Sequence, residues 1–373
     1  MAGSELTRPL GLSKPKPRRR GIYIAAGAAV AVLAVAGLAW LVVGARGPTA
    51  TAVINAPPPK TVAALADQTG SMPPQKSGTG TLTDVTPSGA LTNVGEVVIH
   101  NPSDPQPVVL AALPEQDLVE ASSDGPLPRI AAGGRRPLDA YARPSQADPQ
   151  NMRIAIVVGG LGIDPASTKG AIASLPGEVT LAFAPYDTTM AADVAAARAA
   201  GHELLLQIPL EPFGYPKTDP GPNTLTDDAT PAENQGRLRW FLGRMTNYVG
   251  VVNYLGAVFT ANEDAMTPVM QEIAGRGLLY LDDGSSGRSK AGAVAGSNAP
   301  FLRADVILDA DLSPAAIDER LGQLQAIARQ RGYAIATATA FPVTVDRVAA
   351  FVKAAADKGI TIVPVSAMVA AHS

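Results

Sequence analysis

The chain has 373 residues and a formal net charge of −3, with 46% hydrophobic and 17% charged residues. A charge this close to zero gives no electrostatic basis for nucleic acid as a partner. The absence of cysteine excludes disulfides, thiolate metal sites and cysteine nucleophiles, and only three histidines are present, His100, His202 and His372.

The amino-terminal residues predict a membrane anchor. Residues 1–20 form a basic tail that ends in three arginines, and residues 21–44 are apolar and carry no charge. A span of this length crosses a hydrocarbon core of roughly 30 Å, and it exceeds the about 7–15 apolar residues of a signal peptide. Because the basic residues precede the span, we expect the tail in the cytoplasm and everything after the span outside it.

Residues 45–150 are predicted to connect the apolar span to a folded domain. Residues 45–124 are rich in Pro, Gly, Ser, Thr and Ala without helical periodicity, which is typical of a solvated, disordered linker. Within this linker, residues 94–100 have the composition of a short strand. Residues 125–150 combine prolines, arginines and apolar residues, and we expect them to dock onto the folded body.

Residues 151–373 alternate between strand-like and helix-like stretches. Asp164, Thr230 and Ser313 each stand before a proline and predict helix starts. The pattern predicts an α/β fold, a (β/α) barrel of about seven to eight strands, with an open doubly wound sheet as the alternative. The expected strands are residues 154–158, 179–183, 203–208, 249–253, 278–282, 304–308, 334–338 and 361–365, and the later helices are residues 190–200, 231–246, 263–275, 314–331 and 345–358.

In such a barrel the functional side chains lie at the carboxyl ends of the strands. Of the adjacent Asp282 and Asp283, only one should face a site, because neighbouring strand residues point to opposite faces; capping of the following turn is the alternative role. His202 precedes a strand, so we expect it at the opposite end in a structural role. The candidate pocket consists of Tyr186, Gln207, Glu211, Asn253, Asp282 and Asp283.

The glycine cluster after the first expected strand does not fit a dinucleotide site. Gly159-Gly-Leu-Gly162 is followed by Pro165, which stands where the G-x-G-x-x-G pattern requires its third glycine.

The order and spacing of several stretches resemble the divergent polysaccharide deacetylase family of bacterial envelopes. These stretches are residues 154–158, 180–186, 202–212, 221–225, 250–256, 277–282, 306–309 and 342–344. The resemblance implies a (β/α) barrel related to metal-dependent amide deacetylases. In that family an Asp-Asp pair after the first strand supplies a base and a metal ligand, and histidines after later strands complete the site.

This chain departs from the family pattern at each of those positions. Gly159 and Gly160 replace the aspartate pair, Tyr254 replaces the histidine after the fourth strand, and Thr339 replaces the histidine after the seventh. A hydrolytic metal site needs about three protein ligands and a base. These degenerate positions therefore predict no catalytic residue, no metal ligand and no cofactor.

The resulting hypothesis is a single-pass protein of the bacterial inner membrane, anchored by residues 21–44, with its barrel in the periplasm. It predicts a pseudoenzyme that binds a glycan or an envelope protein. One alternative is an active polysaccharide deacetylase in which Asp282, Asp283 and Glu211 surround zinc or another divalent metal. The other is a structural envelope scaffold.

Overall fold

The computed structural model describes residues 79–85, 91–98, 108–145, 147, 151–187 and 190–371. The predicted membrane span at 21–44 and much of the predicted linker lie outside them. Among the described residues, no helix is both long and apolar enough to cross a membrane. Strands β1 (Thr79–Val85) and β2 (Leu91–Val98) form an antiparallel pair within the predicted linker, and β2 overlaps the short strand expected at 94–100.

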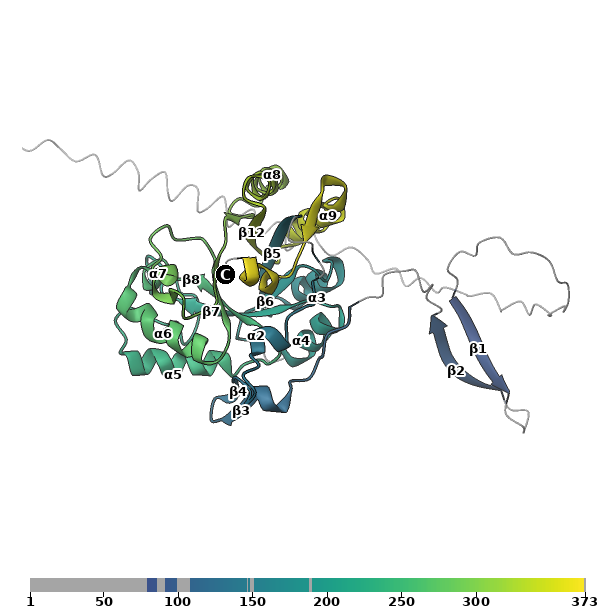
Figure 1. The fold of residues 1–373 in the computed structure, drawn as a ribbon, viewed down its shortest axis with the longest axis horizontal. Coiled ribbons are helices and arrows are strands. Elements are labelled where there is room, and N and C mark those ends of the chain that lie inside the picture. Colours follow the sequence, from purple (N-terminus) through teal and green to yellow (C-terminus); the bar gives the residue numbers. More distant parts are fainter. Residues whose placement is uncertain are drawn as a thin grey trace, which may run out of the picture. The chain divides into compact units, whose positions relative to one another are not determined.

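A parallel nine-stranded sheet forms the centre of the main body (Figure 1). Its order is β10-β9-β8-β7-β6-β5-β12-β11, and β13 pairs with the first residues of β5. The end strands β10 and β11 are not paired with each other, so the curled sheet is not closed by hydrogen bonds. The strands are β5 (Met152–Leu161), β6 (Thr180–Phe183), β7 (Leu204–Leu210), β8 (Gly250–Leu255), β9 (Leu279–Asp282), β10 (Phe301–Arg303), β11 (Val306–Ile307), β12 (Tyr333–Thr339) and β13 (Ile360–Ile362).

Helices surround this sheet (Figure 1). Their starts follow the sequence: the side chains of Asp164, Thr230 and Ser313 accept hydrogen bonds from backbone N–H groups of the first turn, and Thr230 forms a capping box with Glu233. The helices are α3 (Pro165–Ser174), α4 (Met190–Ala199), α5 (Pro231–Leu242), α6 (Glu263–Gly275), α7 (Ala291–Ala295), α8 (Pro314–Arg331) and α9 (Pro342–Lys353).

The expected alternation is confirmed as a curled parallel sheet with helices outside, consistent with a (β/α) barrel. The short elements β10 and α7 were not predicted, because three and five residues give too little periodicity to detect. Helix α9 starts at Pro342 rather than at residue 345, since proline fits the first turn.

The segment before the barrel fills the amino end of the sheet's inner face. We call residues 108–145 the plug segment; it contains η1 (Gln116–Leu118), β3 (Val119–Ser122), β4 (Gly125–Pro128) and α2 (Pro137–Ala140). Leu118, Leu138 and Tyr141 form one buried cluster with inward-facing strand residues such as Ala155 and Leu205. The C-terminal 3-10 helix η4 (Val365–Ala371) adds Val365 and Met368 to that cluster.

The plug segment therefore begins earlier than the docking segment predicted at 125–150, and the linker does not extend to residue 124. Leu110 and Leu118 are buried, and the backbone N–H of Leu110 donates to the oxygen of Arg198 at 3.1 Å. The prolines and glycines of this stretch suggested a linker. A few of its apolar residues are nevertheless sufficient to attach it, because they pack against inward-facing strand residues at the amino end of the sheet.

Buried polar groups fix the plug segment to the barrel. Glu203, at the start of β7, is fully buried and accepts hydrogen bonds from the backbone N–H groups of Arg143 (3.0 Å) and Ser366 (2.9 Å). His202 is also buried, and its Nδ1 lies 2.8 Å from the backbone oxygen of Val179. The predicted position of His202, away from the carboxyl ends of the strands, is confirmed.

Candidate functional site

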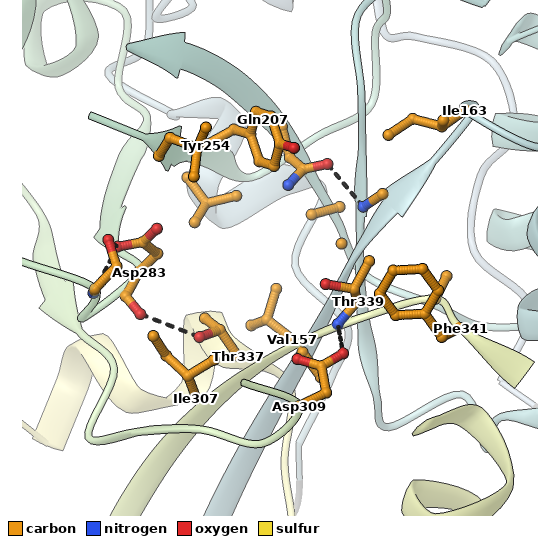
Figure 2. A pocket seen from close by; sticks show the side chains of 18 of the residues that line it. Val157, Ile163, Gln207, Tyr254, Asp283, Ile307, Asp309, Thr337, Thr339 and Phe341 are labelled. Atoms are coloured by element: carbon orange, nitrogen blue, oxygen red, sulfur yellow. Dashed lines mark hydrogen bonds between the residues drawn. The ribbon is translucent and has the colours of Figure 1, made fainter. Parts of the chain in front are cut away.

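The double glycine, Gly159 and Gly160, lies within β5 near its carboxyl end and forms a bulge. The register of β5 against β6 shifts between Val158 and Leu161, and Gly160 has a φ of +79°. Glycine adopts this left-handed conformation without the penalty that a side chain would bring. The Gly160 N–H consequently leaves the strand ladder and donates to the side-chain oxygen Oε1 of Gln207 at 2.7 Å (Figure 2).

Gln207 occupies the room that a side chain at position 159 would need. A Cβ added to Gly159 would lie 2.8 Å from Nε2 of Gln207. Since the Gly160 N–H requires an acceptor, the amide oxygen faces it and the amide NH2 takes the other direction. The Gln207 side chain is only 9% exposed, and among the described residues its Nε2 has no hydrogen-bond partner.

A cavity of about 500 Å³ opens at the carboxyl ends of the strands (Figure 2). All four degenerate positions line it: Gly159, Gly160, Tyr254 and Thr339. The sheet thus brings together the positions that the family resemblance singled out. The other lining residues include polar ones, among them Asp164, Gln207, Asn253, Asp283, Asp309 and Thr337, and apolar ones, among them Val157, Ile163, Ala182, Val252, Leu255 and Phe341.

A second cavity of about 230 Å³ adjoins the first and is more apolar. Ile163, Gln207 and Tyr254 line both. Tyr186 forms part of its wall, held by ring contacts with Trp240 (6.5 Å between centroids) and Phe241 (6.2 Å). The remaining wall includes Ala184, Pro185, Pro209, Asp219, Pro220, Gly221 and Pro222.

Asp283 and Asp309 are two of the three aspartates that line the larger cavity. Oδ1 of Asp283 accepts from the Ser285 N–H at 2.8 Å, and Oδ2 of Asp309 accepts from the Thr339 N–H at 2.7 Å. Burial raises the pKa of both carboxyls, against the lowering effect of these hydrogen bonds. The Ser285 hydroxyl donates to the same Oδ1 of Asp283 at 2.6 Å, and the Thr344 hydroxyl donates to the same Oδ2 of Asp309 at 3.2 Å.

Asn253 supports Asp283 from the neighbouring strand. Its Oδ1 accepts from the Asp283 backbone N–H at 2.9 Å, and its Nδ2 donates to the backbone oxygen of Leu255 at 2.7 Å. The hydroxyl of Thr337 donates to the backbone oxygen of Asp283 at 3.1 Å. The turn that carries Asp283 is therefore fixed from two sides.

Of the six predicted pocket residues, Gln207, Asn253 and Asp283 line the first cavity and Tyr186 the second. Asp282 lines neither: it is buried, and its Oδ1 accepts from the Gly284 N–H at 2.9 Å, which is the turn-capping role. Glu211 lines neither, because its carboxylate turns to the Asp227 N–H at 2.6 Å. Asp309 follows β11 and Thr337 lies within β12; both line the cavity, although neither was in the predicted pocket.

The donor set does not fit the metal that the family resemblance implies. Within the described residues, no group of three or more His, Cys, Asp or Glu side chains is placed to hold a metal ion. Oδ2 of Asp282 is buried without a partner in the described chain, but Asp282 does not line the cavity. Glu211 does not line it either, since its carboxylate accepts from the Asp227 N–H. The alternative in which these two residues and Asp283 surround a metal is therefore not supported by the positions of their side chains.

The curled parallel sheet with helices outside it is consistent with the (β/α)-barrel class, and the cavity lies at the carboxyl ends of its strands. The chain belongs to the divergent polysaccharide deacetylase family, whose model matches residues 156–369. The resemblance seen in the sequence is thereby confirmed.

Similar proteins have been described without an assigned activity. The uncharacterized protein YibQ of Escherichia coli K12 is 28% identical over 195 residues, which cover 52% of this chain and 60% of YibQ. An uncharacterized protein of Haemophilus influenzae is 26% identical over 194 residues, covering 52% of this chain and 68% of that protein. The crystal structure of an uncharacterized Agrobacterium tumefaciens C58 protein matches with 46% identity and a TM-score of 0.64, over 65% of this chain and 99% of the other.

Proposed function

We propose that this protein is a non-catalytic, saccharide-binding member of its family that serves in the bacterial envelope. The observation that carries the proposal is the Gln207 amide, which stands where a side chain at position 159 would have to lie. An aspartate there would be the family's base or ligand. In its place the cavity offers an amide donor that binds but does not move a proton.

The chemistry of the remaining lining suits a hydroxyl-rich ligand. The carboxylates of Asp283 and Asp309 can accept hydrogen bonds from hydroxyl groups, and the Gln207 NH2 can donate one. Tyr254, 39% exposed, offers an aromatic face at the mouth. A few fixed polar groups in a concave, partly apolar cavity are the usual composition of a small-molecule site.

The test is saccharide binding by the full chain in detergent, measured by calorimetry together with zinc content and acetate release. We expect binding of an oligosaccharide such as chitotriose, no stoichiometric zinc and no acetate. Tyr254→Ala should weaken binding about tenfold. Tyr215→Ala is the matched control, since Tyr215 is similarly exposed (37%) and lines neither cavity. Zinc-dependent acetate release by the unchanged protein would overturn the proposal.

The proposal includes anchoring in the inner membrane by residues 21–44, with the barrel in the periplasm. It is supported by the uncharged apolar run and the preceding basic residues. A reporter that is active only outside the cytoplasm, fused after Ser373, should be active. Activity of a cytoplasm-specific reporter at the same position would reverse the orientation, and a mature chain starting near Gly47 would replace the anchor by a cleaved signal.

A further inference from the structure

We infer that Gln207 is a specificity-determining residue whose amide NH2 donates a hydrogen bond to an acceptor oxygen of the ligand. The cavity then binds uncharged saccharides more tightly than anionic ones. This inference rests on the proposed function and deepens it. It concerns the class of saccharide and the residue that selects it.

The orientation of the amide is fixed by its neighbours. Oε1 is held by the Gly160 N–H at 2.7 Å, and this bond leaves Nε2 as the end of the side chain that is available to a ligand. Although Gln207 is only 9% exposed, its Nε2 is not sealed from the cavity, so an acceptor oxygen of a ligand can take the place of water there. Gln207 lines both cavities, which places the expected acceptor where they adjoin.

The charges around the amide are of one sign. Asp164, Asp283 and Asp309 line the first cavity, and Asp219 lines the second. Neither lining, among the described residues, contains a lysine, arginine or histidine. A uronate or phosphate group would meet like charge in a partly buried site without a compensating cation, and this opposes binding.

Hydroxyl groups meet no such opposition. The Ser285 donors both reach Oδ1 of Asp283, and the Thr339 and Thr344 donors both reach Oδ2 of Asp309, so each carboxylate retains acceptor capacity for a sugar hydroxyl. The apolar wall near Tyr186 accommodates the less polar face of the same ligand. One donor and two acceptors of fixed direction therefore specify an uncharged sugar with an acceptor oxygen over Gln207.

The experiment compares chitotriose, which is uncharged, with trigalacturonate, which is anionic, on the full chain in detergent at pH 7.5. The unchanged protein should bind chitotriose at least about tenfold more tightly. Gln207→Glu retains an oxygen for the Gly160 N–H but replaces the donor by an acceptor, and it should weaken chitotriose binding about tenfold or more. Asp283→Asn should raise the affinity for trigalacturonate and so reduce the difference in affinity between the two saccharides.

The outcomes separate this inference from the proposed function. Absence of binding to either saccharide would remove the proposed function and the inference with it. Binding of chitotriose that is equal in the wild type and in Gln207→Glu, or a preference for trigalacturonate, would leave saccharide binding in place and overturn the inference. If Gln207→Glu does not fold, the side-chain NH2 resonances of Gln207 in the ¹⁵N-labelled wild type decide: they should shift on addition of chitotriose, and unchanged resonances in the bound protein contradict the assignment.

Discussion

The Nη1 atom of Arg198 lies 2.7 Å from the backbone oxygen of Tyr141 and joins helix α4 to the plug segment. Nε of the same guanidinium donates to the backbone oxygen of Ala111 at 3.2 Å. Arg198 is only 2% exposed, and burial lowers its pKa to about 10. A buried guanidinium that bonds to carbonyls of a preceding segment makes that segment part of the barrel's own structure.

Replacing Arg198 should therefore destabilise the whole body. Arg198→Met removes both hydrogen bonds and leaves the Tyr141 carbonyl without this donor, while the Ala111 carbonyl still accepts from Nδ2 of Asn247. We expect a loss of about 3 kcal/mol in the free energy of unfolding. Urea denaturation measures it. Arg329→Met on the exposed side of α8 is the control and should change stability by less than about 0.5 kcal/mol. Equal effects of the two changes would show that the plug segment is not held through Arg198.

Glu203→Gln, which replaces the carboxylate by its neutral isostere, should lower the stability of the protein. Its two carboxylate oxygens accept from the backbone N–H groups of Arg143 and Ser366 and from the Ser366 hydroxyl. In Glu203→Gln one of these oxygens becomes an NH2 that faces a backbone donor. The loss of acceptor capacity should outweigh the removal of a buried charge and cost about 1–3 kcal/mol by chemical denaturation. An unchanged or raised stability would mean that desolvation of the charge dominates.

His202 predicts a pH dependence of stability. Burial lowers its pKa below the ordinary value of 6.5, so the folded protein favours the neutral ring and the unfolded chain takes up the proton first. The stabilisation is present above the unfolded pKa and is lost as the pH falls through the folded one. We expect the unfolding free energy of the wild type to fall between pH 7.5 and pH 5 relative to that of His202→Asn, whose amide can still donate to the Val179 oxygen. A constant difference between the two proteins would contradict this assignment.

The contact between Gln207 and Gly159 should appear as coupling in a double-mutant cycle. Gly159→Ala places a methyl 2.8 Å from Nε2 and should cost about 1–2 kcal/mol. Gln207→Ala removes the obstruction, so the double variant should be more stable than the sum of the single effects by about 1 kcal/mol. Gly170→Ala is the control: no atom lies within 4 Å of the new methyl, and the change should stabilise helix α3 by up to about 1 kcal/mol. Additive single effects would mean that the amide moves aside freely.

Much of this architecture could be predicted because it is local. Alternating apolar runs located the strands, and side chains before prolines located the helix starts, as at Thr230. The opposite directions of Asp282 and Asp283 followed from strand geometry alone. These features depend on residues only a few positions apart.

What the sequence could not reveal depends on distant contacts. Gly160 and Gln207 are 47 residues apart, and no local pattern indicates that the oxygen of one side chain will accept from that particular N–H. Glu211 ends a strand in the same way as the pocket residues, yet the loop at Asp227 captures its carboxylate. The start of the plug segment was missed for the same reason, since Leu110 is buried and its N–H donates to the backbone oxygen of Arg198, 88 residues further along the chain.

The shared space of Gln207 and Gly159 also limits how this protein can evolve. An acidic side chain at position 159 collides with the amide while Gln207 is present. Loss of Gln207 first would deprive the Gly160 N–H of its acceptor. A lineage carrying this pair can acquire an aspartate at position 159 only through a less stable intermediate, or by changing both residues at once. The pair Gln207 and Gly159 is therefore harder to replace one residue at a time than either residue would be alone.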